Sequence, residues 1–139
     1  MDTLDKLKAL SEPVLNPARL PLEEDVRNAE EELGVKFPPS YIKFQLEYSN
    51  LSYGTFEPYL LSEGGSYLDL INAVKEARVF GLPDHLLPFL ADNGDYYCFD
   101  LTTNAPEYTV RYWSHDGTTD ESWEGFLDWV ERCWIEEQS

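Results

Sequence analysis

Two histidines are the side chains in this sequence that ordinarily titrate near neutral pH, and a general base or a zinc site would be expected to use at least one of them. His115 is followed by Asp116, and a neighbouring carboxylate can orient an imidazole. The surrounding run SHDGTT is typical of a loop after a strand, and His85 closes the turn sequence LPDH. We therefore interpret both histidines as turn or surface residues. No Gly-x-Ser-x-Gly, His-Glu-x-x-His or Gly-rich phosphate motif is present, which favours a protein without enzymatic activity.

The other groupings that could hold a metal or carry redox chemistry have simpler structural interpretations. Residues 92–95 read Asp-Asn-Gly-Asp, and hard cations choose clustered oxygens, but the later bidentate Glu of a calcium loop is missing. Asn-Gly is instead typical of a tight hairpin turn. Cys98 and Cys133 lie far apart and belong to no Cys-x-x-Cys pair, so we expect reduced, buried thiols. The sequence predicts neither a metal nor a cofactor.

The composition is strongly acidic. The 139 residues contain 10 Lys and Arg against 27 Asp and Glu, which gives a formal net charge of −17. Nucleic acids and anionic membranes are polyanions that bind through Lys and Arg, so neither is expected as the main partner. A basic protein is the better candidate. The first ten residues lack the apolar core of a signal peptide, and no stretch is apolar enough to span a bilayer, which predicts a cytoplasmic protein.

The first third of the chain is predicted to be helical. Residues 1–20 are expected to form a short helix near residues 3–10 and then a proline-containing connector. Apolar residues at helical spacing from 22 to 33 predict an acidic amphipathic helix that ends at Gly34. After the proline pair at 38–39, aromatic residues at the same spacing predict a second helix of about ten residues.

The middle of the chain is predicted to contain most of the strands. Residues 53–61 are rich in aromatic and β-forming residues and are expected to form a strand. Helical spacing returns at Tyr67 and predicts a helix that ends before Gly81. Two apolar runs, 86–91 and 95–101, flank Asn-Gly and predict a hairpin. A third run, 108–113, extends it to a meander of three strands.

The C-terminal segment is predicted to be an amphipathic helix whose first turn carries Asp120 and Glu121 near the positive end of the helix dipole. Strands in sequence order with flanking helices predict an α+β fold in a single domain, residues 1–139. The apolar stripe of this helix comprises Trp123, Phe126, Leu127, Val130 and Trp134.

Alternation along the predicted hairpin divides its side chains into two faces. One face carries Tyr97, Phe99, Leu101, Val110 and Tyr112, and we expect it to form the core beneath the helices. The other face mixes aromatic and charged side chains, a composition that suits a protein interface as well as a second small core, so both interpretations stay open. The candidate partner-binding residues are this second set and the acidic residues of the adjoining turns, namely Tyr96, Asp100, Arg111, Trp113, Asp92, Asp95 and Asp116.

Three segments in order resemble a known family. The opening segment LEEDVRNAEEELGVKFPPSYIKFQLEYSN is similar to the N-terminal signature of the SUKH superfamily, which includes yeast cell-wall-synthesis regulators and many bacterial toxin-immunity proteins. The segment LPFLADNGDYYCFDL is similar to the central hairpin of that family, and SWEGFLDWV is similar to its closing helix. The chain departs from the family pattern at residues 50–54, where members often have a Gly-rich turn.

The resemblance implies a curved antiparallel sheet in the α+β domain, no known catalytic residues and a role in binding another protein. It leaves two hypotheses. In the first, the chain is an immunity protein that binds and neutralises a cognate basic toxin domain, such as a nuclease. In the second, it is an intracellular regulatory or scaffold domain like the yeast members, and its acidity serves solubility. The partner's identity, and whether the chain is a monomer or a homodimer, stay open.

Overall fold

The computed structural model describes residues 2–12, 14, 19–61, 68–92 and 94–138. No helix in these residues is long and apolar enough to cross a membrane. In chain order the elements are α1 (Thr3–Leu10), α2 (Glu23–Leu33), α3 (Pro39–Glu47), α4 (Leu70–Val79), β1 (Leu86–Asp92), β2 (Asp95–Asp100), β3 (Thr109–Ser114), β4 (Gly117–Trp123), α5 (Phe126–Trp129), the π-helix η1 (Val130–Ile135) and α6 (Glu136–Gln138).

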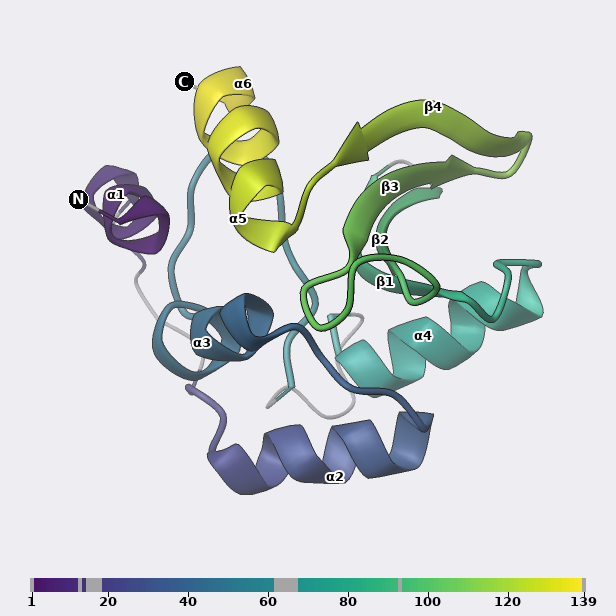
Figure 1. The fold of residues 1–139 in the computed structure, drawn as a ribbon. Coiled ribbons are helices and arrows are strands. Elements are labelled where there is room, and N and C mark those ends of the chain that lie inside the picture. Colours follow the sequence, from purple (N-terminus) through teal and green to yellow (C-terminus); the bar gives the residue numbers. More distant parts are fainter. Residues whose placement is uncertain (1, 13, 15–18, 62–67, 93, 139) are drawn as a thin grey trace.

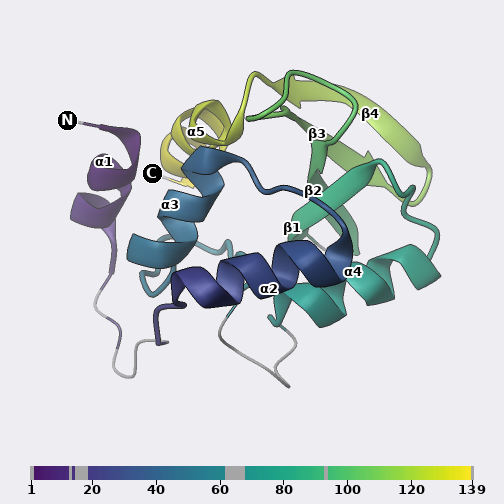
Figure 2. The same cartoon turned by 60° about the horizontal axis from the view of Figure 1, so that its bottom comes forward.

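The strands form one curved antiparallel sheet in the order β1-β2-β3-β4, which confirms the predicted α+β meander with flanking helices (Figure 1). The C-terminal helix and α3 lie beside the sheet, and α1 lies beyond the C-terminal helix. The α2 and α4 helices run next to each other below the sheet (Figure 2). The predicted helices at 3–10, 22–33 and 39–48 are also present, and α2 ends at Gly34 in the left-handed conformation.

One face of the sheet carries the main hydrophobic core. Tyr97, Phe99 and Val110 are buried in it, as alternation predicted, and Leu101 and Tyr112 pack against it while partly exposed. The α3, α5 and η1 helices supply the opposing side chains of the same cluster. The strand pairing therefore fixes which half of the hairpin's side chains faces the helices.

Tyr41 of α3 lies at the centre of this core and is fully buried. Its ring meets the rings of Phe99 and Phe126 edge-on, with centroids 5.1 and 5.2 Å away. Gln45, one turn later, donates from Nε2 to the Tyr41 hydroxyl at 2.9 Å and to the Tyr59 carbonyl oxygen at 2.8 Å. Helix α3, the sheet, the C-terminal helix and the segment at Tyr59 thus meet around one side chain.

The C-terminal helix widens in its middle, where η1 is a π-helix. Cys133, Trp134 and Ile135 are all buried. The predicted apolar stripe is partly wrong: Leu127 is exposed, and Trp129, which the stripe omits, is fully buried. The predicted stripe started at Trp123, which lies in β4, whereas the buried stripe starts at Phe126 and continues with Trp129, Val130, Cys133 and Trp134.

The predicted strand over residues 53–61 is wrong. Tyr59 N–H donates to the Phe89 carbonyl oxygen at 3.0 Å, and Leu60 N–H donates to that of Leu68 at 2.7 Å. These bonds do not extend into a ladder: within residues 53–61 the pairing is limited to an isolated bridge between Leu60 and Asp69. The aromatic residues that suggested a strand serve packing instead.

A fourth strand replaces the predicted loop after His115 and the predicted start of the C-terminal helix. Asp120 and Glu121 lie in β4, paired with β3, and the helix begins only at Phe126. The run TTDES in β4 carries no apolar alternation, so the strand depends on hydrogen bonding to β3 rather than on its own burial. The predictions that fall on Asn93, Tyr67 and residues 15–18 lie outside the described residues.

Two glycines allow the backbone constraint at the end of α2 to be tested. Gly34 has φ 68°, and a Cβ added there would have no atom within 4 Å, so Gly34→Ala is expected to lower the free energy of unfolding by about 1 kcal/mol through backbone strain alone. Gly125 has extended backbone, φ 177°, and a Cβ there would make ordinary contacts, the nearest 3.8 Å from Glu107. Gly125→Ala should leave stability unchanged or raise it by up to about 1 kcal/mol. Urea unfolding checks both, and equal effects of the two substitutions would contradict the expectation.

Candidate protein-binding surface

The second face of the sheet packs against the C-terminal end of α4. Cys98 and Trp113 form a small buried cluster there with Ala77, Leu82 and Leu86. Of the two interpretations that the sequence left open, a second small core is therefore present where α4 covers the sheet. A role in partner binding stays a prediction, and it concerns the open margin of this cluster.

At that margin the structure forms an aromatic cavity. Tyr96 and Trp113 are cross-strand neighbours whose rings stack with centroids 6.0 Å apart. The end of α4 lies beside them, and its Phe80 is 70% exposed. A cavity of about 370 Å³ is lined by Phe80, Gly94, Tyr96, Trp113 and His115, which we call the aromatic socket.

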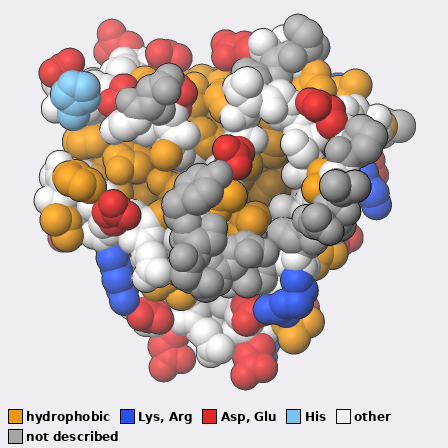
Figure 3. Space-filling model, turned by 180° about the vertical axis from the view of Figure 1, so that it is seen from behind, with side chains coloured by type: hydrophobic (Ala, Val, Ile, Leu, Met, Phe, Trp, Pro, Cys, Tyr) orange, Lys and Arg blue, Asp and Glu red, His pale blue; other side chains and the backbone are white. Residues whose placement is uncertain are grey.

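The socket is continuous with a larger apolar surface. Val79, directly before Phe80, is 84% exposed. Figure 3 shows the rear of the molecule, where α4 and the hairpin lie on the left, and hydrophobic side chains gather there between acidic ones. Adjacent exposed apolar side chains beside an aromatic cavity are a composition found at protein interfaces.

The acidic residues of the hairpin turns hold the strands together next to the socket. Asp95 Oδ1 accepts a hydrogen bond from the His115 backbone N–H at 3.2 Å and lies 3.2 Å from His115 Nδ1. The Tyr112 hydroxyl lies 3.2 Å from Asp95 Oδ2 and 3.4 Å from Asp92 Oδ2. Partial burial raises the pKa of Asp95, but the hydrogen bonds from His115 and Tyr112 outweigh it and hold that pKa below its ordinary value.

The structure gives the two histidines surface positions. The side chain of His115 is mostly exposed, and its nearest carboxylate is Asp95 rather than its sequence neighbour Asp116, whose Oδ1 lies 3.8 Å from Nε2. His85 is exposed in the turn before β1. Among the residues that the structure describes, no group of three or more His, Cys, Asp or Glu side chains could hold a metal ion.

Asp100 and Arg111, both predicted at the binding surface, form an ion pair on the sheet. Arg111 Nε donates to Asp100 Oδ2 at 2.8 Å, and the Thr102 hydroxyl donates to Oδ1 at 2.6 Å. Burial raises the pKa of Asp100, but the hydrogen bonds from Thr102 and Arg111 outweigh it and lower that pKa below its usual range. Asp100 is buried, so this geometry gives the pair a structural role between β2 and β3.

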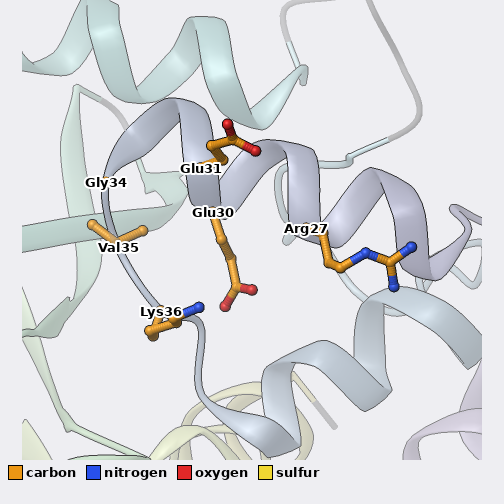
Figure 4. Close-up of a pocket in the computed structure, with 6 residues that line it drawn as sticks. All are labelled: Arg27, Glu30, Glu31, Gly34, Val35 and Lys36. Carbon is orange, nitrogen blue, oxygen red and sulfur yellow. The ribbon is translucent and has the colours of Figure 1, made fainter.

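Another cavity, of about 520 Å³, lies where α2 meets the following loop. In Figure 4 the side chains of Glu30 and Lys36 point toward one another, whereas Glu31 points away. Glu30 Oε2 accepts a hydrogen bond from the Phe37 backbone N–H at 2.7 Å, which fixes the loop. Arg27 and Lys36 balance the two glutamates in charge, so this cavity has no preference for one sign of ligand.

An acidic groove of about 540 Å³ lies between β4 and the end of the C-terminal helix. Glu137, which lines it, has its Oε2 3.5 Å from the Sγ of buried Cys133. The groove adds to the negative surface of the protein but contributes little apolar area. Its lining comprises Asp120, Glu121, Ser122, Trp123, Arg132, Glu136 and Glu137.

The structure brings Tyr96 and Trp113 together on one face, as the strand alternation predicted, and Asp95 and His115 lie in the adjoining turns. It adds Phe80 to the cavity, with Val79 directly before it, and sequence reasoning missed both. A sequence signal exists for Val79: the buried stripe of α4 consists of Leu70, Ala73, Val74 and Ala77, and Val79 falls outside it, whereas Phe80 stands seven residues after Ala73 and keeps its spacing. Apolar residues off the buried stripe of a short helix are candidates for contact with a partner.

Comparisons with known proteins agree with this architecture. The family model SUKH_5, described as SMI1-KNR4 cell-wall, matches residues 1–135. A crystal structure of a protein from Pseudomonas syringae pv. tomato is similar, with a TM-score of 0.85 and 32% sequence identity over 96% of this chain and 97% of that one. A comparison with curated proteins gives no match.

The Asp100–Arg111 pair should make stability depend on pH. Because the folded-state pKa of Asp100 is lowered, its carboxylate stabilises the fold above its ordinary pKa of about 3.9, and this contribution is lost as the pH falls below that value. Asp100→Asn should lower the free energy of unfolding by about 2 kcal/mol at neutral pH and flatten the loss of stability in acid. The measurement is urea unfolding across pH, with Asp120→Asn on exposed β4 as the matched control. The same acid slope in both variants would contradict the role of the pair.

The two cysteines should be unreactive in the folded protein. Both are buried and free, and burial raises the pKa of Cys133 to about 12 and that of Cys98 further. Because the thiolate is the reactive form, neither thiol should react with an aromatic disulfide reagent at about pH 8, while both should react in denaturant. The denatured sample is the control, and stoichiometric reaction of the folded protein would count against buried thiols.

Proposed function

Since the chain belongs to the SUKH family, in the group described as SMI1-KNR4 cell-wall, we propose that it is a protein-binding module of the immunity type. It binds a basic toxin domain in the cytoplasm, neutralises it by occupying its active surface, and needs no catalysis or cofactor to do so. The observation that carries the proposal is a net charge of −17 on a chain with an apolar, aromatic docking surface.

The charge supports a toxin that acts on nucleic acid. A nuclease must present Lys and Arg to the phosphate backbone of its substrate. A strongly acidic protein is complementary to that surface, so opposite charge speeds their encounter, and the bound protein blocks access of the substrate. Asp95 and Asp116 lie next to His115 of the aromatic socket, and Asp92 shares the Tyr112 hydroxyl with Asp95. These three are the acidic residues we assign to this contact.

The family description favours one other function. It names the cell wall, and the yeast regulators that give the family its name suggest an intracellular regulatory or scaffold domain. In that case the acidity serves solubility, and the partner would be an endogenous protein with no excess of Lys and Arg.

A rescue experiment with a rate measurement tests the immunity function. We expect co-expression of this chain to abolish the toxicity of a basic toxin domain encoded beside its gene. For the purified pair, the association rate constant should fall about tenfold or more when salt rises from about 50 to about 500 mM, because the ions screen the attraction.

The control is an unrelated acidic protein of similar size, which should neither rescue growth nor form the complex. The scaffold function would replace the immunity function if no neighbouring toxin domain is neutralised and an endogenous regulatory protein is recovered in stoichiometric amount. If growth is rescued but the association rate constant does not change with salt, charge steering is removed from the proposal.

A further inference from the structure

We propose that the aromatic socket, with Val79 and Phe80 at its edge, binds a bulky apolar side chain of a protein partner that is flanked there by Lys or Arg. The inference rests on the proposed protein-binding function and assigns that function a surface and a recognition chemistry. It does not depend on what the partner does, since the same surface would serve a toxin or an endogenous protein.

The base of the socket is packed from behind. Trp113 is only 8% exposed and stacks on Tyr96, and behind it the small buried cluster includes Cys98 and Leu86. Asp95 holds the β3–β4 turn against β2 through the His115 backbone amide. A pocket whose walls are already packed loses little conformational entropy when a partner fills it.

The rim of the socket is apolar and unusually open. Phe80 lines the cavity and is 70% exposed, and Val79, directly before it at the end of α4, is 84% exposed. Burial of exposed apolar side chains is favourable, so a partner that covers both gains a large share of an interface's free energy. A packed aromatic base with an open apolar rim is the arrangement of a binding hot spot.

The charge around the socket determines which kind of partner segment it can bind. Asp116, whose side chain is 88% exposed, lies 3.8 Å from His115 of the socket. Asp84, 97% exposed, lies 3.8 Å from Arg78, which stands two residues before Phe80 in the chain. Arg78 is offset by Asp84, and Asp95 and Asp92 add further negative charge at the hairpin turn. The surroundings of the socket are therefore net acidic, and they favour Lys or Arg beside the inserted side chain.

The same charge disfavours a second copy of this chain as the occupant. In a twofold dimer each surface faces itself, so Asp84 and Asp116 of one copy would approach the acidic residues of the other. Like charges at close range cost several kcal/mol in an interface. A basic partner is the occupant that covers the apolar rim without this repulsion.

Short peptides of defined sequence test this recognition without knowledge of the partner. The probes are the blocked pentapeptides KKFKK, KKAKK and EEFEE, titrated into the ¹⁵N-labelled full chain by NMR. KKFKK should shift the amide signals of Gly94 and Tyr96 and the indole signal of Trp113. Binding of KKAKK and EEFEE should be about tenfold weaker or more, because each lacks one half of the recognition.

Two variants locate the site. Phe80→Ser should weaken KKFKK binding about tenfold, and its exposed position leaves the core intact. Leu22→Ser is the matched control: it removes an exposed apolar side chain, 60% exposed, at the start of α2, and Ser is well accepted at an N-cap. The proposal would be overturned if KKAKK binds as well as KKFKK, if the NMR shifts are confined to the acidic groove at β4, or if Phe80→Ser has no effect on binding. It would also be overturned if the wild-type protein sediments as a dimer that Phe80→Ser dissociates.

The outcomes separate this inference from the proposed function. If no toxin is neutralised but KKFKK binds at the socket, the recognition chemistry stands and the immunity function falls. If Phe80→Ser neutralises a toxin with undiminished affinity, the immunity function stands and the socket is not its binding surface.

Discussion

The buried aromatic cluster around Tyr41 is the constraint on which the rest of the structure depends. Tyr41 brings a hydroxyl into a fully buried position, and Gln45 supplies the hydrogen bond that such a hydroxyl requires. Its ring also contacts Phe99 on the sheet and Phe126 on the C-terminal helix. Because these three elements come from distant parts of the chain, their relative placement is set by the packing of a few rings, and the curvature of the sheet follows from wrapping around them.

This placement determines what the second face of the sheet can do. The α3 and α5 helices pack on one face, and among the described residues the small cluster on the other face takes its one helical side chain, Ala77, from α4. The open margin of that cluster begins just after α4 ends, at Phe80, and it includes Tyr96. The candidate surface therefore lies where α4 stops covering the sheet.

The sequence predicted the elements whose own side chains determine them. The end of α2 at Gly34 and the alternation of β2 and β3 are confirmed. In the predicted stripe of α2, Val26 and Ala29 are buried, whereas Leu22 is exposed at the N-cap. The errors have a common cause. Strand β4 has no apolar alternation and is fixed by pairing with β3, and residues 53–61 have strand composition but form only an isolated bridge, between Leu60 and Asp69. In both cases backbone pairing with another segment decides the structure, and the periodicity of the side chains does not contain that pairing.

The candidate surface could also be predicted only in part. Alternation placed Tyr96 and Trp113 on one face. It could not predict that Trp113 would be buried or that Asp100 would pair with Arg111, because both depend on the neighbouring strand and on α4. The protein as a whole carries a net charge of −17, which repels itself and opposes compaction. Asp95 and Asp100 are partly or fully buried and hold strands together, whereas the side chains of Asp84 and Asp116 are almost fully exposed and lie 3.8 Å from their nearest basic groups. Exposed carboxylates of this kind add to the repulsion in the free protein, and under the proposed function a surface of opposite charge would relieve it.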